Sequence, residues 1–386
     1  QDARDSQKEY GAYTDVIPRS RVVGEGGAAW SDAGIIVPYT MYKMYGDLSI
    51  LEECYSSMLD YMDYLSVTNL EGPHPTYGDW LAYEPTEARL ICIAYYAYDA
   101  LLVSKMSAAL SKKAGDEYEE KAEEYYVLYT KIKSHFQKVY LDANGKLKQT
   151  SQTAYLLALK FDLLPEEYRE EARKELAAKL VKNGYRLSTA ILNQTLSEIG
   201  ESNLAYSLLL QKENPSWLYS IYQGATTIWE RWNSYTKESG FGDVGMNSFN
   251  HYAYGAVAEW MYKYMAGIET DEKKPGFKHI IFQPKPDLRE EYELPYGQER
   301  IKWVRACFES VSGPIEAAWY MEEDTFTYIV SIPKESYATL YLPVFDKNAK
   351  TITVDGRIYP VDTFPTEKGC IVLYLPSGRH QIEALR

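Results

Sequence analysis

The pattern of apolar residues changes once along this 386-residue chain, and the change limits the folds open to it. Up to about Gly267, apolar residues recur at spacings of three and four, as on one face of a helix. Turn signals such as Gly72-Pro73 and Asn183-Gly184 separate these runs. The sequence therefore predicts a series of helices, which suits a toroid of paired helices. The predicted helical runs are 35–45, 50–65, 88–110, 118–140, 154–163, 167–180 and 204–210.

The last third of the chain has a different pattern. Short runs rich in β-branched and aromatic residues are separated there by Pro, Gly and Asp, which is typical of an all-β region with many turns. The clearest are 279–282, 325–330, 338–342 and 370–374. Their number and spacing suit a sandwich. We therefore expect a helical domain over 1–268 and a β domain over 269–386. A purely structural role is favoured for the β domain, because no cluster of Trp marks a binding face.

One segment, 223–235, concentrates the chemistry of a sugar site. It places the carboxylate of Glu230 between Trp229 and Trp232 and beside Arg231. Sugar rings stack their C–H faces on aromatic rings, and glycosidic cleavage needs carboxylates for proton transfer. His251 adds a further polar group downstream. The alternative is an aromatic-rich helix start in a core, with Glu230 paired to Arg231 at the surface.

The amino-acid composition limits the kinds of molecule that this chain is expected to bind. The net charge of −14 leaves no basic stripe to neutralise phosphates, which argues against nucleic acid. No run of eighteen or more apolar residues predicts a membrane span. Tyr is unusually frequent, with 37 copies, and suits carbohydrate clefts, although most of these residues are expected to pack helix faces. A neutral small-molecule partner fits best, and the compartment and oligomeric state stay open.

The four cysteines predict neither a metal site nor a cofactor. Cys54, Cys92, Cys307 and Cys370 lack short metal-ligand spacing. Cys54 and Cys92 fall in helical patterns and are expected to be buried free thiols. Cys307 and Cys370 both fall in the β-rich region, where a pairing between them is a minor alternative.

Several segments together resemble the α-L-rhamnosidases of glycoside hydrolase family 78. The segment 224–232 followed by 249–257 looks like that family's signature, and the resemblance runs over nearly the whole chain. The other matching segments, in chain order, are Gly26-Gly27-Ala28-Ala29-Trp30-Ser31-Asp32-Ala33, Tyr77-Gly78-Asp79-Trp80-Leu81, Gln152-Thr153-Ala154-Tyr155 and Pro275-Gly276-Phe277-Lys278-His279-Ile280.

This resemblance implies an (α/α)6 barrel followed by a jelly-roll-like domain, and inverting hydrolysis of terminal α-L-rhamnosides in polysaccharides or glycosides. The family's general acid lies in an upstream Asp-Cys-Pro-x-Arg motif that this chain does not contain. We therefore expect the chain to be the C-terminal portion of a longer rhamnosidase, with the opening barrel helices also upstream and the missing N-terminal portion as a partner.

The resemblance also assigns roles to residues. Glu230 matches the general base, and His251 matches a residue that contacts the rhamnose, with a satisfied helix N-terminal histidine as its alternative. Trp30 and Trp80 match the walls of the rhamnose subsite, which suits the apolar methyl of a 6-deoxy sugar.

The remaining predicted substrate-binding residues lie beside these. Asp32 and Asp79 are candidates to hydrogen-bond sugar hydroxyls, with a helix N-cap as the competing role, equally weighted for Asp32. Trp229 and Trp232 flank the base, and one of them is expected to be core.

The sequence departs from the family over 188–195, where a glycine-bearing loop at the cleft rim is replaced by a segment without glycine, so the aglycone preference stays open.

Two other functions remain open. The chain could be a non-catalytic carbohydrate-binding protein or pseudoenzyme that keeps the aromatic walls without the acid. A toroid that acts on uronates is ranked lower, because a uronate would call for a cationic cleft and Arg231 is the main cation of these motifs.

Overall fold

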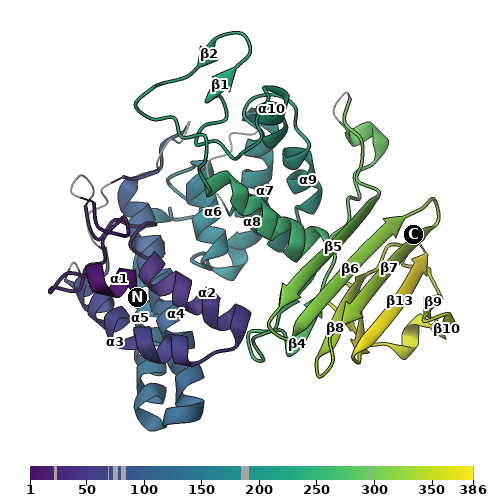
Figure 1. The fold of residues 1–386 in the computed structure, drawn as a ribbon, viewed down its shortest axis with the longest axis horizontal. Helices are drawn as coiled ribbons and strands as arrows, with labels where there is room; N and C mark the ends of the chain where they lie inside the picture. Colours follow the sequence, from purple (N-terminus) through teal and green to yellow (C-terminus); the bar gives the residue numbers. More distant parts are fainter. Residues whose placement is uncertain are drawn as a thin grey trace. The chain divides into compact units, whose positions relative to one another are not determined.

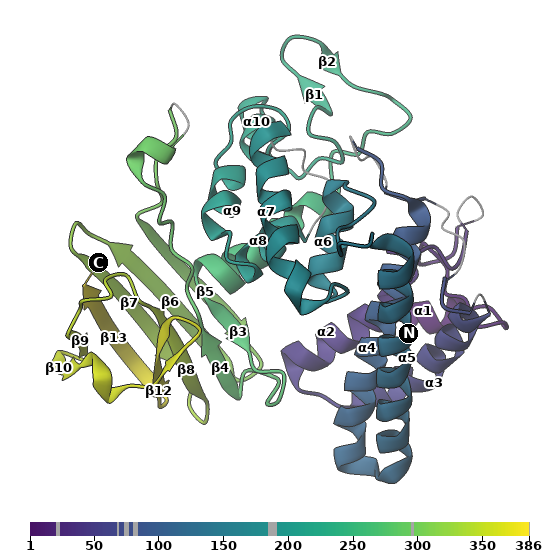
Figure 2. The same cartoon turned by 180° about the vertical axis from the view of Figure 1, so that it is seen from behind.

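A computed structural model describes residues 1–20, 24–67, 69–72, 77–79, 84–183, 191–294 and 297–385. The chain divides into two compact units. The first unit comprises Gln1–Tyr42 and Asp47–Ser188, and the second comprises Lys43–Gly46 and Thr189–Arg386. Each unit is described by itself; Figures 1 and 2 show the elements of both from opposite sides.

The first unit is helical, as predicted. Its long helices α4 and α5 lie side by side and antiparallel, joined at Gly115, whose φ of 96° allows the sharp reversal (Figures 1 and 2). In α5 the buried residues Tyr125, Tyr129, Ile132, Phe136 and Tyr140 recur at spacings of three and four, which is the periodicity that predicted the helix. The helices are α1 (Asp2–Ser6), α2 (Ala33–Tyr45), α3 (Ser49–Ser66), α4 (Ala88–Ala114), α5 (Asp116–Tyr140), α6 (Gln152–Lys160) and α7 (Glu166–Asn183).

The second unit begins with shorter helices. A small hairpin of β1 (Tyr235–Thr236) and β2 (Gly240–Phe241) interrupts them (Figure 1). The helical elements are α8 (Leu192–Glu198), α9 (Ser202–Leu209), α10 (Trp217–Tyr222), the 3₁₀ turn η1 (Ala253–Ala256), α11 (Val257–Trp260) and the π-helical turn η2 (Met261–Met265).

The segment 188–195, which replaces the family's glycine-bearing loop, is mostly helical where the structure describes it. Residues from Leu192 onward form α8 and are buried rather than looped out. The helix forms there because Leu192 and Leu196 are both fully covered by the protein. Residues 188–190 lie outside the described residues.

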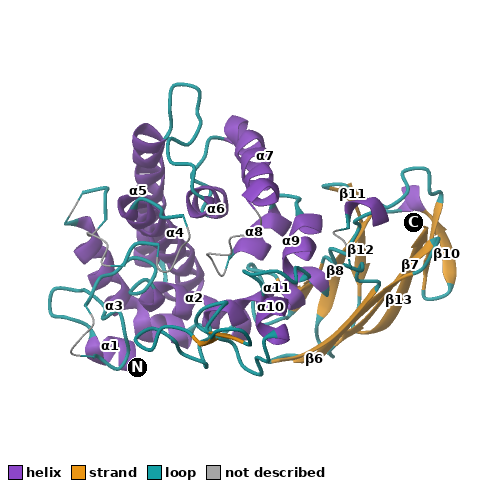
Figure 3. Cartoon of the chain, turned by 90° about the horizontal axis from the view of Figure 1, so that it is seen from above, coloured by secondary structure: helices purple, strands orange, loops and turns teal. Residues whose placement is uncertain are grey.

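The rest of the second unit is a two-layer β-sandwich, as predicted. Strand order is β10-β9-β13-β7-β6-β5 in one sheet and β11-β12-β8-β4-β3 in the other. Side chains from both sheets form one continuous core. Helices and strands are distinguished in Figure 3. The strands are β3 (Ile268–Thr270), β4 (His279–Phe282), β5 (Trp303–Ser310), β6 (Gly313–Met321), β7 (Thr325–Ile332), β8 (Tyr337–Pro343), β9 (Thr351–Val354), β10 (Arg357–Pro360), β11 (Thr366–Glu367), β12 (Cys370–Leu375) and β13 (Gly378–Leu385).

Among the described strands of the sandwich, neighbours are antiparallel except at one place. Strand β4 pairs with β8 in parallel, with His279 opposite Tyr337. All four strands predicted from the sequence are present within one or two residues of their expected ends. The jelly-roll-like assignment and the closed barrel stay predictions, as does the domain boundary between 268 and 269.

Two buried aromatic side chains bind the end of the last helical turn to the sandwich. The indole N–H of Trp319 donates to the carbonyl of Met265 at 2.7 Å, and the Tyr328 hydroxyl donates to the carbonyl of Ala266 at 2.8 Å. Both side chains are fully buried. They satisfy carbonyls that a helix end leaves without partners, so the helical and β parts of this unit are joined by their cores.

The cysteines are all free thiols. Cys92 is buried as expected, whereas Cys54 is only half-buried. Cys307 lies on β5 and Cys370 on β12, which belong to different sheets, so the pairing between them is not formed. Among the described residues, no helix is both long enough and apolar enough to cross a bilayer.

Candidate functional site

Glu230 lies in a non-helical segment of the second unit. Two segments, 227–230 and 248–251, run alongside each other there. The Glu230 N–H donates to the Ser248 carbonyl at 2.9 Å, and the His251 N–H donates to the Ile228 carbonyl at 2.8 Å. The Ser248 N–H in turn donates to Oε2 of Glu230 at 2.8 Å. These bonds fix the backbone and one carboxylate oxygen together.

The other carboxylate oxygen of Glu230, Oε1, has no hydrogen-bond partner within the described part of the chain, and the residue is partly exposed. Among the described residues, Glu230 forms no ion pair with Arg231 and does not start a helix, so the alternative of a surface pair at a helix start is not realised. A carboxylate with one oxygen anchored and one available can accept a proton from water.

Both indoles beside Glu230 are buried. Trp229 is 7% exposed and contacts the rings of Phe249 and Tyr235. Trp232 is 3% exposed and stacks on Tyr254 with ring centroids 3.7 Å apart. The expectation that one of them is core extends to both, and contact of either with a sugar stays a prediction.

His251 uses one ring nitrogen inside the protein. Its Nδ1 accepts a hydrogen bond from the Ala253 N–H at 3.3 Å, at the start of η1. The alternative of a histidine satisfied at a helix N-terminus is therefore partly realised. Because Nδ1 is an acceptor, the neutral ring carries its proton on Nε2, which can donate to a ligand.

In the first unit, Trp30 lies on a loop held tightly by the protein. The Asp15 carboxylate accepts from the Gly27 N–H and the Ser31 hydroxyl, both at 2.7 Å. A Cβ on Gly27 would lie 2.9 Å from that carboxylate, which explains the glycine at this position. The partly exposed Trp30 ring packs on Tyr77, with centroids 4.9 Å apart. Two motif segments far apart in sequence therefore meet at Trp30.

Asp32 occupies the residue before α2 but does not cap it with its side chain. The Asp32 main-chain carbonyl accepts from the N–H groups of Ile35 and Ile36, as at an N-cap position. Its side-chain oxygens instead accept from the Tyr61 hydroxyl at 2.9 Å and from the Ala29 N–H at 2.5 Å. Burial raises the pKa of Asp32 above its usual range. Both oxygens are occupied within the protein.

Asp79 lies beside a third motif segment. Its Oδ2 accepts from the Thr86 hydroxyl at 2.7 Å, and that hydroxyl is also 2.7 Å from the hydroxyl of Ser151, the N-cap of α6. Burial raises the pKa of Asp79, and hydrogen bonds from Thr86 and Thr153 oppose the rise. Asp79 is therefore part of a polar network at the start of α6.

The structure thus gathers the predicted residues into two groups. One holds Trp30, Asp32 and Asp79 in the first unit, and the other holds Trp229, Glu230, Trp232 and His251 in the second. Trp80 lies outside the described residues. The sequence did not single out Tyr77 as a partner of Trp30, although its neighbours Gly78 and Asp79 belong to a motif. It also did not identify Ser248, because a backbone N–H donor has no sequence signature.

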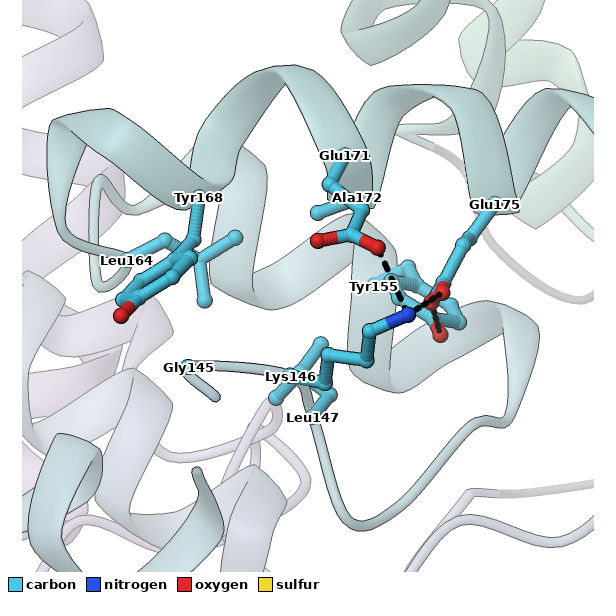
Figure 4. Close-up of a pocket in the computed structure, with 9 residues that line it drawn as sticks. All are labelled: Gly145, Lys146, Leu147, Tyr155, Leu164, Tyr168, Glu171, Ala172 and Glu175. Carbon is cyan, nitrogen blue, oxygen red and sulfur yellow. Dashed lines mark hydrogen bonds and ion pairs between the residues drawn. The ribbon is translucent and has the colours of Figure 1, made fainter. Parts of the chain in front are cut away.

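A small pocket in the first unit is lined by none of the predicted site residues. It holds about 10 Å³, roughly the room for one water (Figure 4). Lys146 reaches across it to Glu171 at 2.6 Å and to Glu175 at 3.4 Å, and the Tyr155 hydroxyl also binds Glu175. Figure 4 shows these side chains converging from the turn at Lys146, from α6 and from α7. An ionic cross-link between the turn and α7 therefore lines this pocket, and the pocket is too small for a sugar.

Two family models together match most of the chain. The bacterial alpha-L-rhamnosidase 6 hairpin glycosidase domain matches residues 1–265, and the bacterial alpha-L-rhamnosidase C-terminal domain matches residues 267–356.

Curated relatives agree with these matches. An alpha-L-rhamnosidase of Streptomyces avermitilis is 35% identical over 98% of this chain and 35% of its own length. One of Formosa agariphila is 34% identical over all of this chain and 41% of its own length. The chain therefore spans between a third and a half of these relatives.

Solved structures have the same fold. The S. avermitilis alpha-L-rhamnosidase complexed with L-rhamnose has a TM-score of 0.86 and 34% identity, and the alignment covers 99% of this chain and 35% of that one. The alpha-L-rhamnosidase from Dictyoglumus thermophilum also has a TM-score of 0.86, with 29% identity over all of this chain and 43% of that one.

Proposed function

Because this chain belongs to the bacterial α-L-rhamnosidase family, we propose that it carries the general base and part of the sugar subsite of an inverting α-L-rhamnosidase. The substrates would be terminal α-L-rhamnosides of polysaccharides or glycosides. The observation that carries the proposal is the state of Glu230, with Oε2 anchored by the Ser248 N–H and Oε1 available.

In the proposed reaction, Oε1 of Glu230 takes a proton from a water molecule. That water attacks the anomeric carbon from the face opposite the leaving group, which inverts the configuration. Inversion requires a second carboxyl, the general acid, at roughly 6.5–9.5 Å from the first. The family resemblance places that acid in a motif absent from these 386 residues, so the complete reaction is proposed for a longer protein.

His251, Trp30 and Trp80 would bind the sugar. His251 would donate from Nε2 to a hydroxyl, since its Nδ1 is already engaged. Trp30 would face the apolar side of the ring, where the 6-deoxy methyl has no hydroxyl to satisfy. Trp80 is proposed for the same wall from the resemblance alone.

A direct test is release of nitrophenol from p-nitrophenyl α-L-rhamnoside, which has a good leaving group and depends least on the acid. We expect slow turnover by this chain at high protein concentration and loss of it in Glu230→Gln. Glu238→Gln is the matched control, since Glu238 is an exposed carboxylate in the nearby turn between β1 and β2. Added azide should restore turnover to Glu230→Ala and give the β-rhamnosyl azide, because a small anion can replace the activated water.

Two results would contradict the base assignment: equal turnover by the parent and Glu230→Gln, or an azide product of retained configuration. Binding of L-rhamnose without turnover in either protein would instead favour the carbohydrate-binding alternative for this chain.

A further inference from the structure

Two carboxyl groups are buried together in the first unit, beside the loop that carries Trp30. Asp32 is 2% exposed, and Asp99, in the middle of α4, is 0% exposed. The Asp32 oxygens accept from the Ala29 N–H and the Tyr61 hydroxyl. No donor of the described residues reaches either oxygen of Asp99, whose carboxyl instead interacts directly with the carboxyl of Asp32. One carboxyl is therefore stabilised as an anion by two donors, and the other is not.

Among the described residues, no cation acts on either carboxyl to balance two charges. The titratable groups that interact with the pair are Tyr61 from α3 and Cys92 and Tyr95 from α4. All three are neutral near pH 7, and burial raises the pKa of each further. Two buried carboxylates side by side would repel each other without compensation, so one of them keeps a proton. Burial and the neighbouring charge of Asp32 raise the pKa of Asp99 well above its usual range.

The backbone bond made by Asp32 determines where Trp30 lies. Ala29 has a φ of 68°, in the left-handed region that a residue with a Cβ rarely adopts. The Asp32 carboxylate accepts the N–H of this residue, and Trp30 follows it directly. The strained residue therefore needs a charged, fully accepting partner, because such residues persist only where the surroundings hold them.

We propose that Asp32 is the positioning residue for Trp30, and that Asp99 carries the single proton that allows Asp32 to stay ionised. The part concerning sugar contact rests on the function proposed above. When Asp99 loses its proton at alkaline pH, the doubly charged pair should release the Ala29 bond and with it the orientation of Trp30. Asp32 then acts on the sugar through Trp30 and not as a direct ligand.

The orientation of Trp30 can be followed in this chain labelled with 5-fluorotryptophan, with Trp30→Phe to assign the ¹⁹F resonance. In the parent we expect the resonance to hold near neutral pH and to move at alkaline pH. In Asp99→Asn, whose amide stays neutral, it should hold throughout. In Asp32→Asn it should be displaced at every pH, because an amide offers one acceptor oxygen. A parent resonance that moves identically in Asp99→Asn would overturn the proposal.

The same resonance reports unfolding of the first unit in denaturant. Above about pH 4 the unfolded chain releases the Asp99 proton while the folded unit keeps it, so stability falls as pH rises. The unfolding constant of the parent relative to Asp99→Asn should therefore rise about tenfold per pH unit until Asp99 ionises in the fold. A ratio independent of pH would show that Asp99 is charged in the native state and would overturn the proposal.

A measurement on the parent alone covers the case in which a variant does not fold. With ¹³Cγ-labelled aspartate, the resonance of one buried carboxyl should keep the chemical shift of a protonated acid at pH 7. If every aspartate were ionised at pH 7, the proposal would be overturned.

Binding of L-rhamnose separates this proposal from the function proposed above. If the parent does not bind L-rhamnose, the proposed rhamnoside site is contradicted. The ¹⁹F resonance of Trp30 and the ¹³C resonances of the aspartates still test the roles of Asp32 and Asp99. If the parent binds it, Asp32→Asn should bind more weakly and Asp99→Asn should not.

Discussion

The two ring nitrogens of His251 have different roles, one structural and one proposed for sugar binding. Nδ1 closes the start of η1 by accepting the Ala253 N–H, and Nε2 is the nitrogen assigned to a sugar hydroxyl. An Asn side chain places its oxygen near the position of Nδ1, whereas a Gln amide reaches the position of Nε2. The two substitutions therefore separate the local structural role from the binding role.

We expect His251→Asn to keep the thermal stability of the parent and to weaken L-rhamnose binding about fivefold to a hundredfold, the range for one lost hydrogen bond. His251→Gln should bind more tightly than His251→Asn but unfold at a lower temperature, because the Ala253 N–H loses its acceptor. Calorimetric titration and thermal unfolding of the two variants check this. The assignment fails if both variants bind like the parent.

At this scale the sequence predicted residue types better than residue environments. Glu230 and His251 could be identified because motifs name them, and both lie on the paired segments 227–230 and 248–251. Asp99 could not be identified, because one acid inside a long helical pattern looks like any solvated residue. Its burial depends on the loop that carries Asp32, far away in the sequence, and no local pattern encodes such a contact.

Among the secondary-structure elements, the short strand β3 links three parts of the second unit through one carboxylate. Glu269 binds Lys263 of η2 and Lys43, which lies 3.3 Å away. Burial would raise the pKa of Glu269, but the charges of Lys263 and Lys43 outweigh it and hold that pKa below its usual value. A lowered pKa means that the folded state binds its proton more weakly than the unfolded state does.

This sign fixes the pH dependence. The stabilisation from Glu269 should be complete above the unfolded value near pH 4.3 and should disappear as pH falls through the lower folded value. Glu269→Gln should lower the free energy of unfolding by about 2–3 kcal/mol at pH 7, since it leaves Lys263 largely buried without its partner. It should also weaken the loss of stability that the parent shows as pH falls from 7 to 3. Denaturant unfolding between pH 3 and 7 measures both, and Glu124→Gln, at an exposed ion pair, should change little. If Glu269→Gln lost stability with falling pH as steeply as the parent, the role given to Glu269 would be contradicted.

The Tyr328 hydroxyl offers a cleaner test of the link between helix and sandwich. Tyr328→Phe removes only the donor to the Ala266 carbonyl and should cost about 1–2 kcal/mol, because that buried acceptor is left without a partner. Tyr374→Phe is the control, since Tyr374 is 74% exposed on β12. Equal stabilities of the two variants in denaturant unfolding would show that the bond contributes nothing.

The secondary-structure elements that the sequence predicted well are those whose buried residues are mainly apolar. Helix α5 shows its buried stripe in the apolar periodicity, and its ends were predicted to within a few residues. Helix α8 was not predicted because four of its six buried residues, from Leu192 to Ser197, are polar. An apolar periodicity cannot reveal a buried face that is built largely from Asn, Gln, Thr and Ser.

For the whole molecule, the compact units do not follow the boundary between the two family matches. One match ends at residue 265 and the next begins at 267, yet Thr189–Arg386 forms a single unit with Lys43–Gly46. The contacts described above explain this, because η2, β3 and the sandwich share buried hydrogen bonds. The Tyr206 hydroxyl of α9 adds another, to the Lys285 carbonyl at 2.7 Å.

We therefore expect a chain that ends at Ala266 to be largely insoluble or to aggregate, since it would leave Tyr206 and the carbonyls of Met265 and Ala266 without their partners. Soluble yield and size-exclusion profiles of residues 1–266 and of the full chain check this at matched expression. A monodisperse short chain with the helix content expected from the full chain would contradict it.

The single parallel pairing in the sandwich has a consequence for synthesis on the ribosome. Only β3 separates β4 from the helical turn η2, but the strand on the other side of β4, β8, emerges about sixty residues later. Until then β4 has only the short β3 as a neighbour and presents an open edge of backbone donors and acceptors. The second unit can complete its helical part only after most of the chain has left the exit tunnel. Slow translation across 283–336 would prolong that exposed interval, and recoding this stretch with rare codons should therefore lower soluble yield without any change in amino-acid sequence.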